Sequence, residues 1–166
     1  MKLQHGLAIL SFLWCLNANA QQSTGSTGDF PSDLGRVAGG IRAMVWVKEI
    51  CADAFPAYSK QNEAAYLEWR KKYLPFLQEM ERYRLAAFMK QVKGNQAALI
   101  ELTTRWEETI EMNKQAFRQR VLAAGPEAFR LTCQSYPAVY LQSDRGNLEH
   151  FYAEQVATIR KGDKPK

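Results

Sequence analysis

The sequence has few of the residues from which catalytic and metal sites are usually built. Its 166 residues include three cysteines and two histidines, and only one histidine, His150, lies outside the first twenty residues. A Ser-His or Cys-His nucleophile needs a nearby base, and a zinc site needs several Cys, His or carboxylate ligands. We therefore expect no catalytic residue, no metal site and no bound cofactor, and we predict that the protein is not an enzyme.

Long apolar runs are also scarce. The N-terminal run Leu7–Leu16 is shorter than the ~20 residues that span a bilayer. It follows Lys2 and precedes Ala18-Asn19-Ala20, a pattern typical of signal-peptide cleavage. We predict that residues 1–20 are a signal peptide and that the protein is periplasmic or secreted; the alternative is an uncleaved anchor. Because Lys2 is the only charged residue in this stretch, its removal lowers the net charge from +5 to +4.

Two cysteines, Cys51 and Cys133, remain outside the predicted signal peptide. Cysteines of exported proteins normally pair, because the compartment is oxidising. We predict a Cys51–Cys133 disulfide. It would close a loop of roughly 80 residues and stabilise the fold by about 4 kcal/mol on the chain-entropy estimate. The alternative is two buried, unpaired thiols.

Strand patterns are missing, since no stretch alternates apolar and polar residues between hairpin turns. Apolar residues at helical spacing instead predict a first helix that begins between residues 34 and 40 and ends at 54, and further helices over 59–93, 96–124, 126–136 and 145–161. Pro75 predicts a kink or break in the second helix, and Asn95 is a suitable N-cap for the third. The predicted fold is an all-α antiparallel bundle of four to five helices, crosslinked by one disulfide.

The composition divides the mature chain into three parts. Residues 21–33 are rich in Gln, Ser, Thr and Gly and are predicted to form a flexible N-terminal segment. Residues 34–161 are predicted to form the helical bundle domain. Residues 162–166 are polar and are predicted to form a frayed tail.

The third predicted helix has an apolar stripe with one polar member, Asn113. The apolar members are Leu99, Leu102, Trp106, Ile110, Phe117 and Val121. An amide in such a stripe usually fixes the register of a packed helix. We therefore predict that Asn113 is a core polar site; a ligand contact inside the bundle is the alternative.

A basic cluster, Arg70-Lys71-Lys72, lies between the aromatic residues Trp69 and Tyr73. Basic and aromatic side chains together are typical of single-stranded nucleic-acid sites. Trp69 and Tyr73, however, fall on the apolar stripe of the second helix, and an exported protein rarely meets nucleic acid. We expect no nucleic-acid binding and regard Arg70, Lys71 and Lys72 as a candidate interaction patch, which could also touch an anionic membrane surface.

These observations favour a binding role. We predict that the protein binds another envelope or secreted protein, as an inhibitor, immunity protein, adaptor or chaperone-like factor. The alternative is a carrier of an apolar or haem-like ligand held between helices, for which Met44 and His150 are the candidate haem ligands. The partner and the oligomeric state are not predicted.

Overall fold

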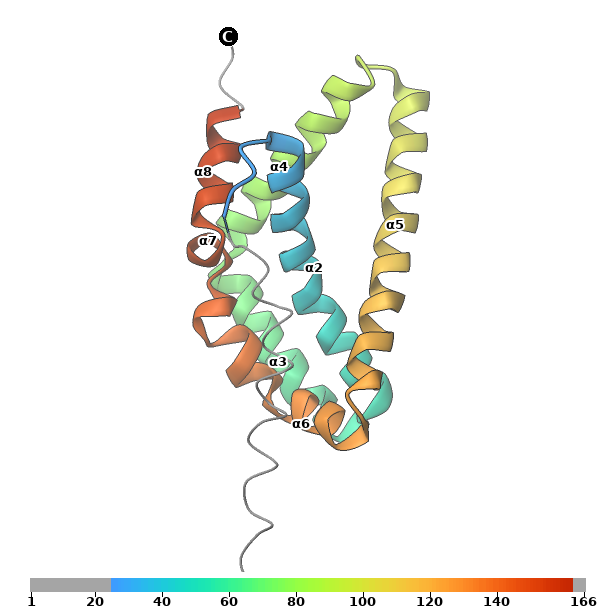
Figure 1. Ribbon diagram of the computed structural model, residues 1–166, viewed down its shortest axis with the longest axis vertical. Coiled ribbons are helices and arrows are strands. Elements are labelled where there is room, and N and C mark those ends of the chain that lie inside the picture. Colours follow the sequence, from blue (N-terminus) through green and yellow to red (C-terminus); the bar gives the residue numbers. More distant parts are fainter. Residues whose placement is uncertain (1–24, 163–166) are drawn as a thin grey trace, which may run out of the picture.

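A computed structural model describes residues 25–162, which fold into helices and short turns without any strand (Figure 1). Within this range the α-helices are α2 (Phe30–Ala54), α3 (Pro56–Lys72), α4 (Leu74–Gln91), α5 (Gln96–Ala123), α6 (Pro126–Tyr136), α7 (Leu148–Phe151) and α8 (Ala153–Gly162). A π-helical turn, Pro137–Leu141, and a 3₁₀ turn, Asp144–Gly146, connect α6 to α7. The predicted helical bundle is confirmed, and the predicted signal peptide lies outside the described residues.

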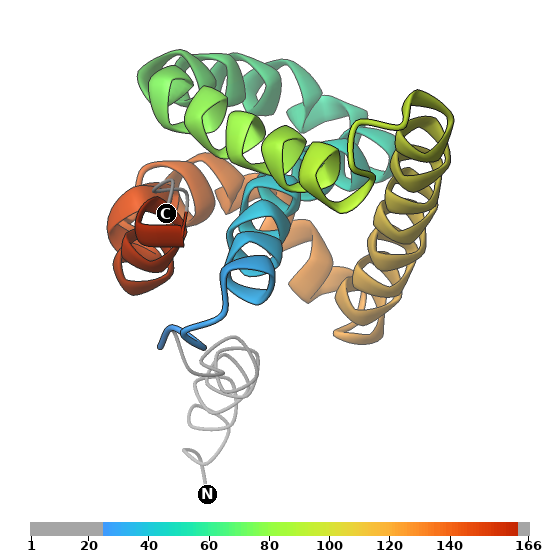
Figure 2. The ribbon, with the colours of Figure 1, turned by 90° about the horizontal axis from the view of Figure 1, so that it is seen from above.

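The helices run alternately down and up the long axis of the molecule (Figure 1). α2 runs down, α3 and α4 return, α5 runs down again, and α8 returns beside α2. Figure 2 shows α2 in the middle of the molecule, and α2 contacts each of the other α-helices. Its buried residues are Asp33, Leu34, Val37, Met44, Val47, Ile50 and Cys51. The core therefore forms around α2.

Most helix boundaries follow the local sequence. Pro56, Pro75 and Pro126 lie in the first turns of α3, α4 and α6, where a missing backbone N–H breaks no helical hydrogen bond. The side chain of Asn95 accepts a backbone hydrogen bond from the first turn of α5, as predicted for an N-cap. The predicted interruption near Pro75 is confirmed, because α3 ends and α4 begins on either side of Tyr73.

The N-terminal boundary of the bundle was predicted wrongly. α2 begins at Phe30, and the preceding turn is ordered by the carboxylate of Asp33, whose residue is fully buried. This carboxylate accepts hydrogen bonds from the Ser26 hydroxyl at 2.5 Å and from the amide and hydroxyl of Thr27 at 2.9 Å each. The Ser26 hydroxyl also lies 2.8 Å from that of Thr158 in α8. Residues 25–33 are therefore not the flexible segment predicted, because polar groups order them without any apolar periodicity.

The C-terminal part also differs from the prediction. The helix predicted over 145–161 is divided at Tyr152 into α7 and α8. The side chain of Asn147 accepts the backbone N–H of His150 and so begins α7 separately. Gly162, predicted to be frayed, ends α8 and lies against Phe30, whose ring would be 2.7 Å from a Cβ at that position.

The disulfide joins α2 to α6 at one end of the molecule. The Cα atoms of Cys51 and Cys133 are 5.2 Å apart, and the two residues are 1% and 0% exposed. The side-chain amide of Asn62 in α3 donates to the carbonyl of Cys133 at 3.1 Å. The Tyr136 hydroxyl of α6 donates to the carbonyl of Met44 in α2 at 2.7 Å. The predicted cysteine pair is confirmed, and it holds α2, α3 and α6 together.

The helix α5 lies at the edge of the bundle, and none of its residues is buried. Its half-buried residues near α2 include Ile110, Lys114, Phe117 and Val121, whereas Asn113 is exposed. Lys114 bonds to Glu49 of α2 at 2.7 Å, and the ring of Phe117 lies 6.0 Å from that of Trp46. The core polar site predicted at Asn113 is therefore wrong. Because α5 is covered from one side only, a single narrow stripe of its residues is half-buried. Lys114, the residue after Asn113, lies on this stripe, whereas Asn113 faces solvent.

Replacing both cysteines, Cys51→Ala with Cys133→Ala, should lower the free energy of unfolding by about 4 kcal/mol, because the unfolded chain regains the freedom that the closed loop removes. Urea denaturation followed by circular dichroism measures the change. Wild-type protein treated with reductant is the control and should match the variant. A variant within about 1 kcal/mol of the oxidised wild type would contradict the role given to the bond.

Asp33→Asn should destabilise the protein by about 1–3 kcal/mol at neutral pH, because a carboxylate that accepts three hydrogen bonds is replaced by an amide. Burial raises the pKa of Asp33, but the hydrogen bonds from Ser26 and Thr27 lower it more, so the pKa lies below 3.8. The contribution of the carboxylate is thus complete above pH 3.8 and disappears as the pH falls through the folded-state pKa.

Urea denaturation of wild type and Asp33→Asn between neutral pH and about pH 3 measures this effect. The difference in unfolding free energy should be largest at neutral pH and should shrink below about pH 4. A difference that is constant across this range would show that the charge of Asp33 has no role.

Candidate interaction surface

The helix α4 has two apolar stripes, and only one of them is buried. Phe76, Met80, Tyr83 and Phe88 form the buried stripe. The second stripe consists of Leu74, Leu85 and Met89, which are 40%, 45% and 43% exposed. Spacings of eleven and four residues place these three side chains on one face of a helix. The rest of the described chain therefore leaves one apolar face of α4 partly uncovered.

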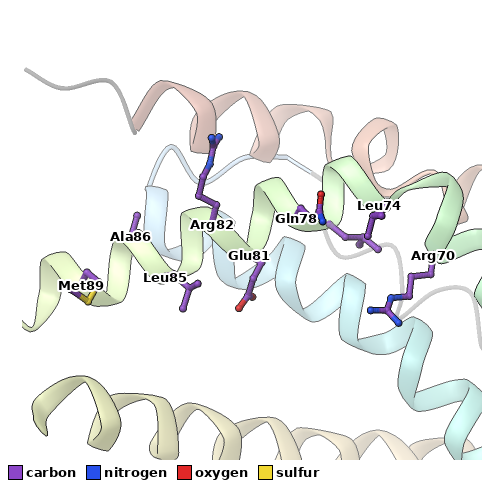
Figure 3. A pocket seen from close by; sticks show the side chains of 9 residues that line it. Arg70, Leu74, Gln78, Glu81, Arg82, Leu85, Ala86 and Met89 are labelled. Atoms are coloured by element: carbon purple, nitrogen blue, oxygen red, sulfur yellow. The ribbon is translucent and has the colours of Figure 1, made fainter. Parts of the chain in front are cut away.

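A groove of about 660 Å³ follows this second stripe (Figure 3). In Figure 3, Glu81 and Leu85 point to one side of α4, and Arg82 points to the other side. All of the groove's walls come from the end of α3 and from α4, so the groove is open on the side that faces away from these helices. We call it the α4 groove; its lining residues are Arg70, Leu74, Leu77, Gln78, Glu81, Arg82, Leu85, Ala86 and Met89.

The one carboxylate that lines the groove, that of Glu81, is already paired. Arg84 donates to it from Nε at 2.9 Å and from Nη2 at 2.5 Å. The hydrogen bond from Arg84 lowers the pKa of Glu81 below its usual value of 4.5, so the carboxylate is charged at neutral pH. The guanidinium of Arg84 also lies 5.0 Å from the Phe88 ring and 5.9 Å from the Trp106 ring of α5. The pair therefore neutralises a groove charge and helps attach α5 to α4.

Two arginines, Arg70 and Arg82, also line the groove, and both are exposed. The guanidinium of Arg82 lies 5.3 Å from the ring of Tyr83. Neither arginine, nor Lys71 or Lys72, forms an ion pair with another residue in the range 25–162. The structure thus places the predicted patch Arg70, Lys71 and Lys72 in the exposed last turn of α3, at one end of the groove. Its use in binding stays a prediction.

The aromatic neighbours of this patch lie as the sequence predicted. Trp69 is 4% exposed, and its indole Nε1 donates to the carbonyl of Gly146 at 2.7 Å. Tyr73 is half-buried, with its ring 5.7 Å from that of Trp69. Both rings are therefore part of the interior and are not free to stack on a base.

The other candidate residues from the sequence are dispersed. Met44 is 5% exposed and belongs to the core, whereas His150 is exposed on α7. No group of three His, Cys, Asp or Glu side chains among the described residues is arranged to hold a metal ion. None of the helices between residues 25 and 162 combines the length and the apolar character needed to cross a membrane.

The exposed stripe was not identified from the sequence. The available signal was a set of apolar residues in α4 that do not belong to its buried stripe, namely Leu74, Leu85 and Met89. Such residues are ordinary when isolated, and only the structure shows that they line one groove.

Comparison with family profiles, with curated proteins and with solved structures finds no match to this chain.

Changing the exposed stripe should alter the surface but leave the fold intact. The triple variant Leu74→Gln, Leu85→Gln and Met89→Gln should unfold within about 1.5 kcal/mol of wild type, since each site is on the surface and each change costs about 0.5 kcal/mol or less. It should bind less of a hydrophobic dye such as ANS, because the apolar row is gone.

The matched control is Leu67→Gln, Leu131→Gln and Val139→Gln, whose sites are 49%, 45% and 43% exposed but do not line the groove. This control should retain the dye binding of wild type. Equal loss of dye binding in both triple variants would contradict a contiguous apolar surface on α4.

Proposed function

We propose that the protein is exported to the periplasm or the cell exterior and binds another protein there through the α4 groove. The observation that carries this proposal is the apolar stripe of α4, Leu74, Leu85 and Met89, which the described chain leaves exposed. Single exposed apolar side chains are common, but a row rimmed by charged residues is typical of an interaction site. The charged rim here is formed by Arg70 and Arg82.

Export is supported by two independent features. Residues 1–20 have the pattern of a cleavable signal peptide. The buried bond between Cys51 and Cys133 requires an oxidising compartment to form and persist. Both features agree with a protein that works outside the cytoplasm.

The chemistry of the groove supports binding. Its lining includes arginine, leucine, glutamine, glutamate, alanine and methionine, and none of the lining residues is a serine, cysteine or histidine. The lining carboxylate of Glu81 is held by Arg84 and is charged, so it is a poor general acid at neutral pH. A role as an inhibitor, immunity protein, adaptor or chaperone-like factor fits this surface.

The groove also has the volume of a small-molecule site, which favours the carrier as a second candidate. Ligand sites commonly have volumes of about 300–1,000 Å³, and the groove has about 660 Å³. Such sites, however, surround most of their ligand. The walls of the α4 groove come only from the end of α3 and from α4, so the groove suits a long segment lying along α4 better than a ligand held between helices.

Site-specific photocrosslinking tests the proposal in the organism that makes the protein. A photoreactive phenylalanine analogue is placed at position 85, where Leu85 faces the groove, and at position 131, where Leu131 has the same 45% exposure. Illumination should give one discrete protein adduct in the envelope fraction for position 85 and no such adduct for position 131. Mass spectrometry then identifies the partner. The same adducts at both positions, or none at position 85, would contradict the proposed function.

A further inference from the structure

We infer that the occupant of the α4 groove is an acidic amphipathic helix of another protein. This inference rests on the proposed function, because it names the partner chemistry for the same surface. It follows from the spacing of the groove residues, from the charges around them and from the two polar residues, Gln78 and Glu81, in the middle of the stripe.

The spacing of the groove residues matches the packing of one helix on another. Leu74, Gln78, Glu81, Leu85 and Met89 follow one another at steps of four, three, four and four residues. Such steps form a ridge along a helix into which a second helix can pack. From the first to the last residue, the ridge is roughly 22 Å long at 1.5 Å per residue. A partner helix of four to five turns would cover it, as in other complexes where a helix lies in an apolar groove.

The charges around the groove select an acidic occupant. Arg70 and Arg82 line the groove, and Lys71 and Lys72 follow Arg70 in the last turn of α3. At the other end, Lys90 lies in the last turn of α4 and Lys93 lies just after it. All six are exposed, and none forms an ion pair within residues 25–162. The lining carboxylate of Glu81 is neutralised by Arg84. A helix with carboxylates beside its apolar stripe would therefore meet complementary charges at Arg70 at one end of the groove and at Arg82 along its side.

The same charges argue against a second copy of this chain as the occupant. In an antiparallel pairing of two α4 helices, Arg70–Lys72 of one copy would approach Lys90 and Lys93 of the other. In a parallel pairing, Arg70 and Arg82 would face the same residues of the second copy. Like charges placed opposite each other disfavour both arrangements.

The middle of the stripe argues against a lipid surface. Gln78 and Glu81 lie between the apolar residues Leu74 and Leu85 on the groove face. Hydrocarbon offers no hydrogen-bond partner for a buried amide or carboxylate, so inserting this face into lipid would be costly. A partner helix with carboxylates can accept hydrogen bonds from the Gln78 amide, while Glu81 keeps its hydrogen bonds from Arg84, which favours protein over membrane.

Synthetic peptides of about 18 residues, or five helical turns, test the inference. The acidic peptide has Leu at heptad positions a and d and Glu or Ala elsewhere. A basic peptide has Lys in place of Glu, and a scrambled peptide has the acidic composition without the stripe. Fluorescence anisotropy with purified protein at physiological ionic strength measures binding. The acidic amphipathic peptide should bind at least about tenfold more tightly than the other two.

Matched variants identify the surface. Leu85→Gln and Arg82→Glu should each weaken binding of the acidic peptide by about tenfold or more. Leu131→Gln and Arg118→Glu are the controls, since Leu131 is as exposed as Leu85 and Arg118 is exposed on α5. Both controls should bind like wild type. Circular dichroism of every variant confirms that a loss of binding is not a loss of fold.

Four results would overturn the inference. Equal affinity for the acidic and scrambled peptides would show attraction by charge alone. Binding to vesicles containing phosphatidylglycerol, with no binding of any peptide, would assign the groove to lipid. A dimer in sedimentation experiments that Leu85→Gln abolishes would assign it to a second copy. If photocrosslinking at position 85 gives a partner but the acidic peptide does not bind, this inference fails while the proposed function stands.

Discussion

The covalent link between Cys51 and Cys133 joins the C-terminal end of α2 to α6 at one end of the bundle. It fixes α6 against the end of α2, and the hydrogen bonds from Tyr136 to Met44 and from Asn62 to Cys133 continue the same junction. The loop that the bond closes contains α3, α4 and α5. Because α3 packs on α2 and is held at this junction, α4 and α5 are left to form the far part of the loop. α5 consequently contributes no buried residue.

The position of α4 explains why it has two apolar stripes. One stripe, which includes Phe76 and Met80, packs into the core around α2. The other is partly bordered by α5, but α5 contributes no buried residue and is attached mainly through Trp106, Phe117 and surface ion pairs. An edge helix held in this way cannot cover the second stripe of α4. The open groove and the exposed apolar row are therefore two consequences of the same arrangement.

Much of the fold could be predicted from the sequence because its signals are local. The export pattern suggested the cysteine pair, Pro75 marked the break between α3 and α4, and Asn95 marked the start of α5. The errors came from interactions between distant residues. Asp33 orders the N-terminal turn through hydrogen bonds that periodicity does not reveal, and Asn113 fits a regular stripe that α5 completes with Lys114 instead. The groove was missed because exposure depends on which helices pack together, and the sequence does not contain that information in any short motif.

The proposed binding role depends most on the exposure of the second α4 stripe in the protein without a partner. NMR of methyl-labelled protein with a soluble paramagnetic agent measures this directly, because the agent broadens the signals of methyl groups that it can reach. The methyl signals of Leu74, Leu85 and Met89 should be strongly broadened, whereas that of Met80, which is 3% exposed on the same helix, should be protected. If the signals of Leu85 and Met89 are protected as well as that of Met80, another part of the chain covers the stripe and the α4 groove does not exist.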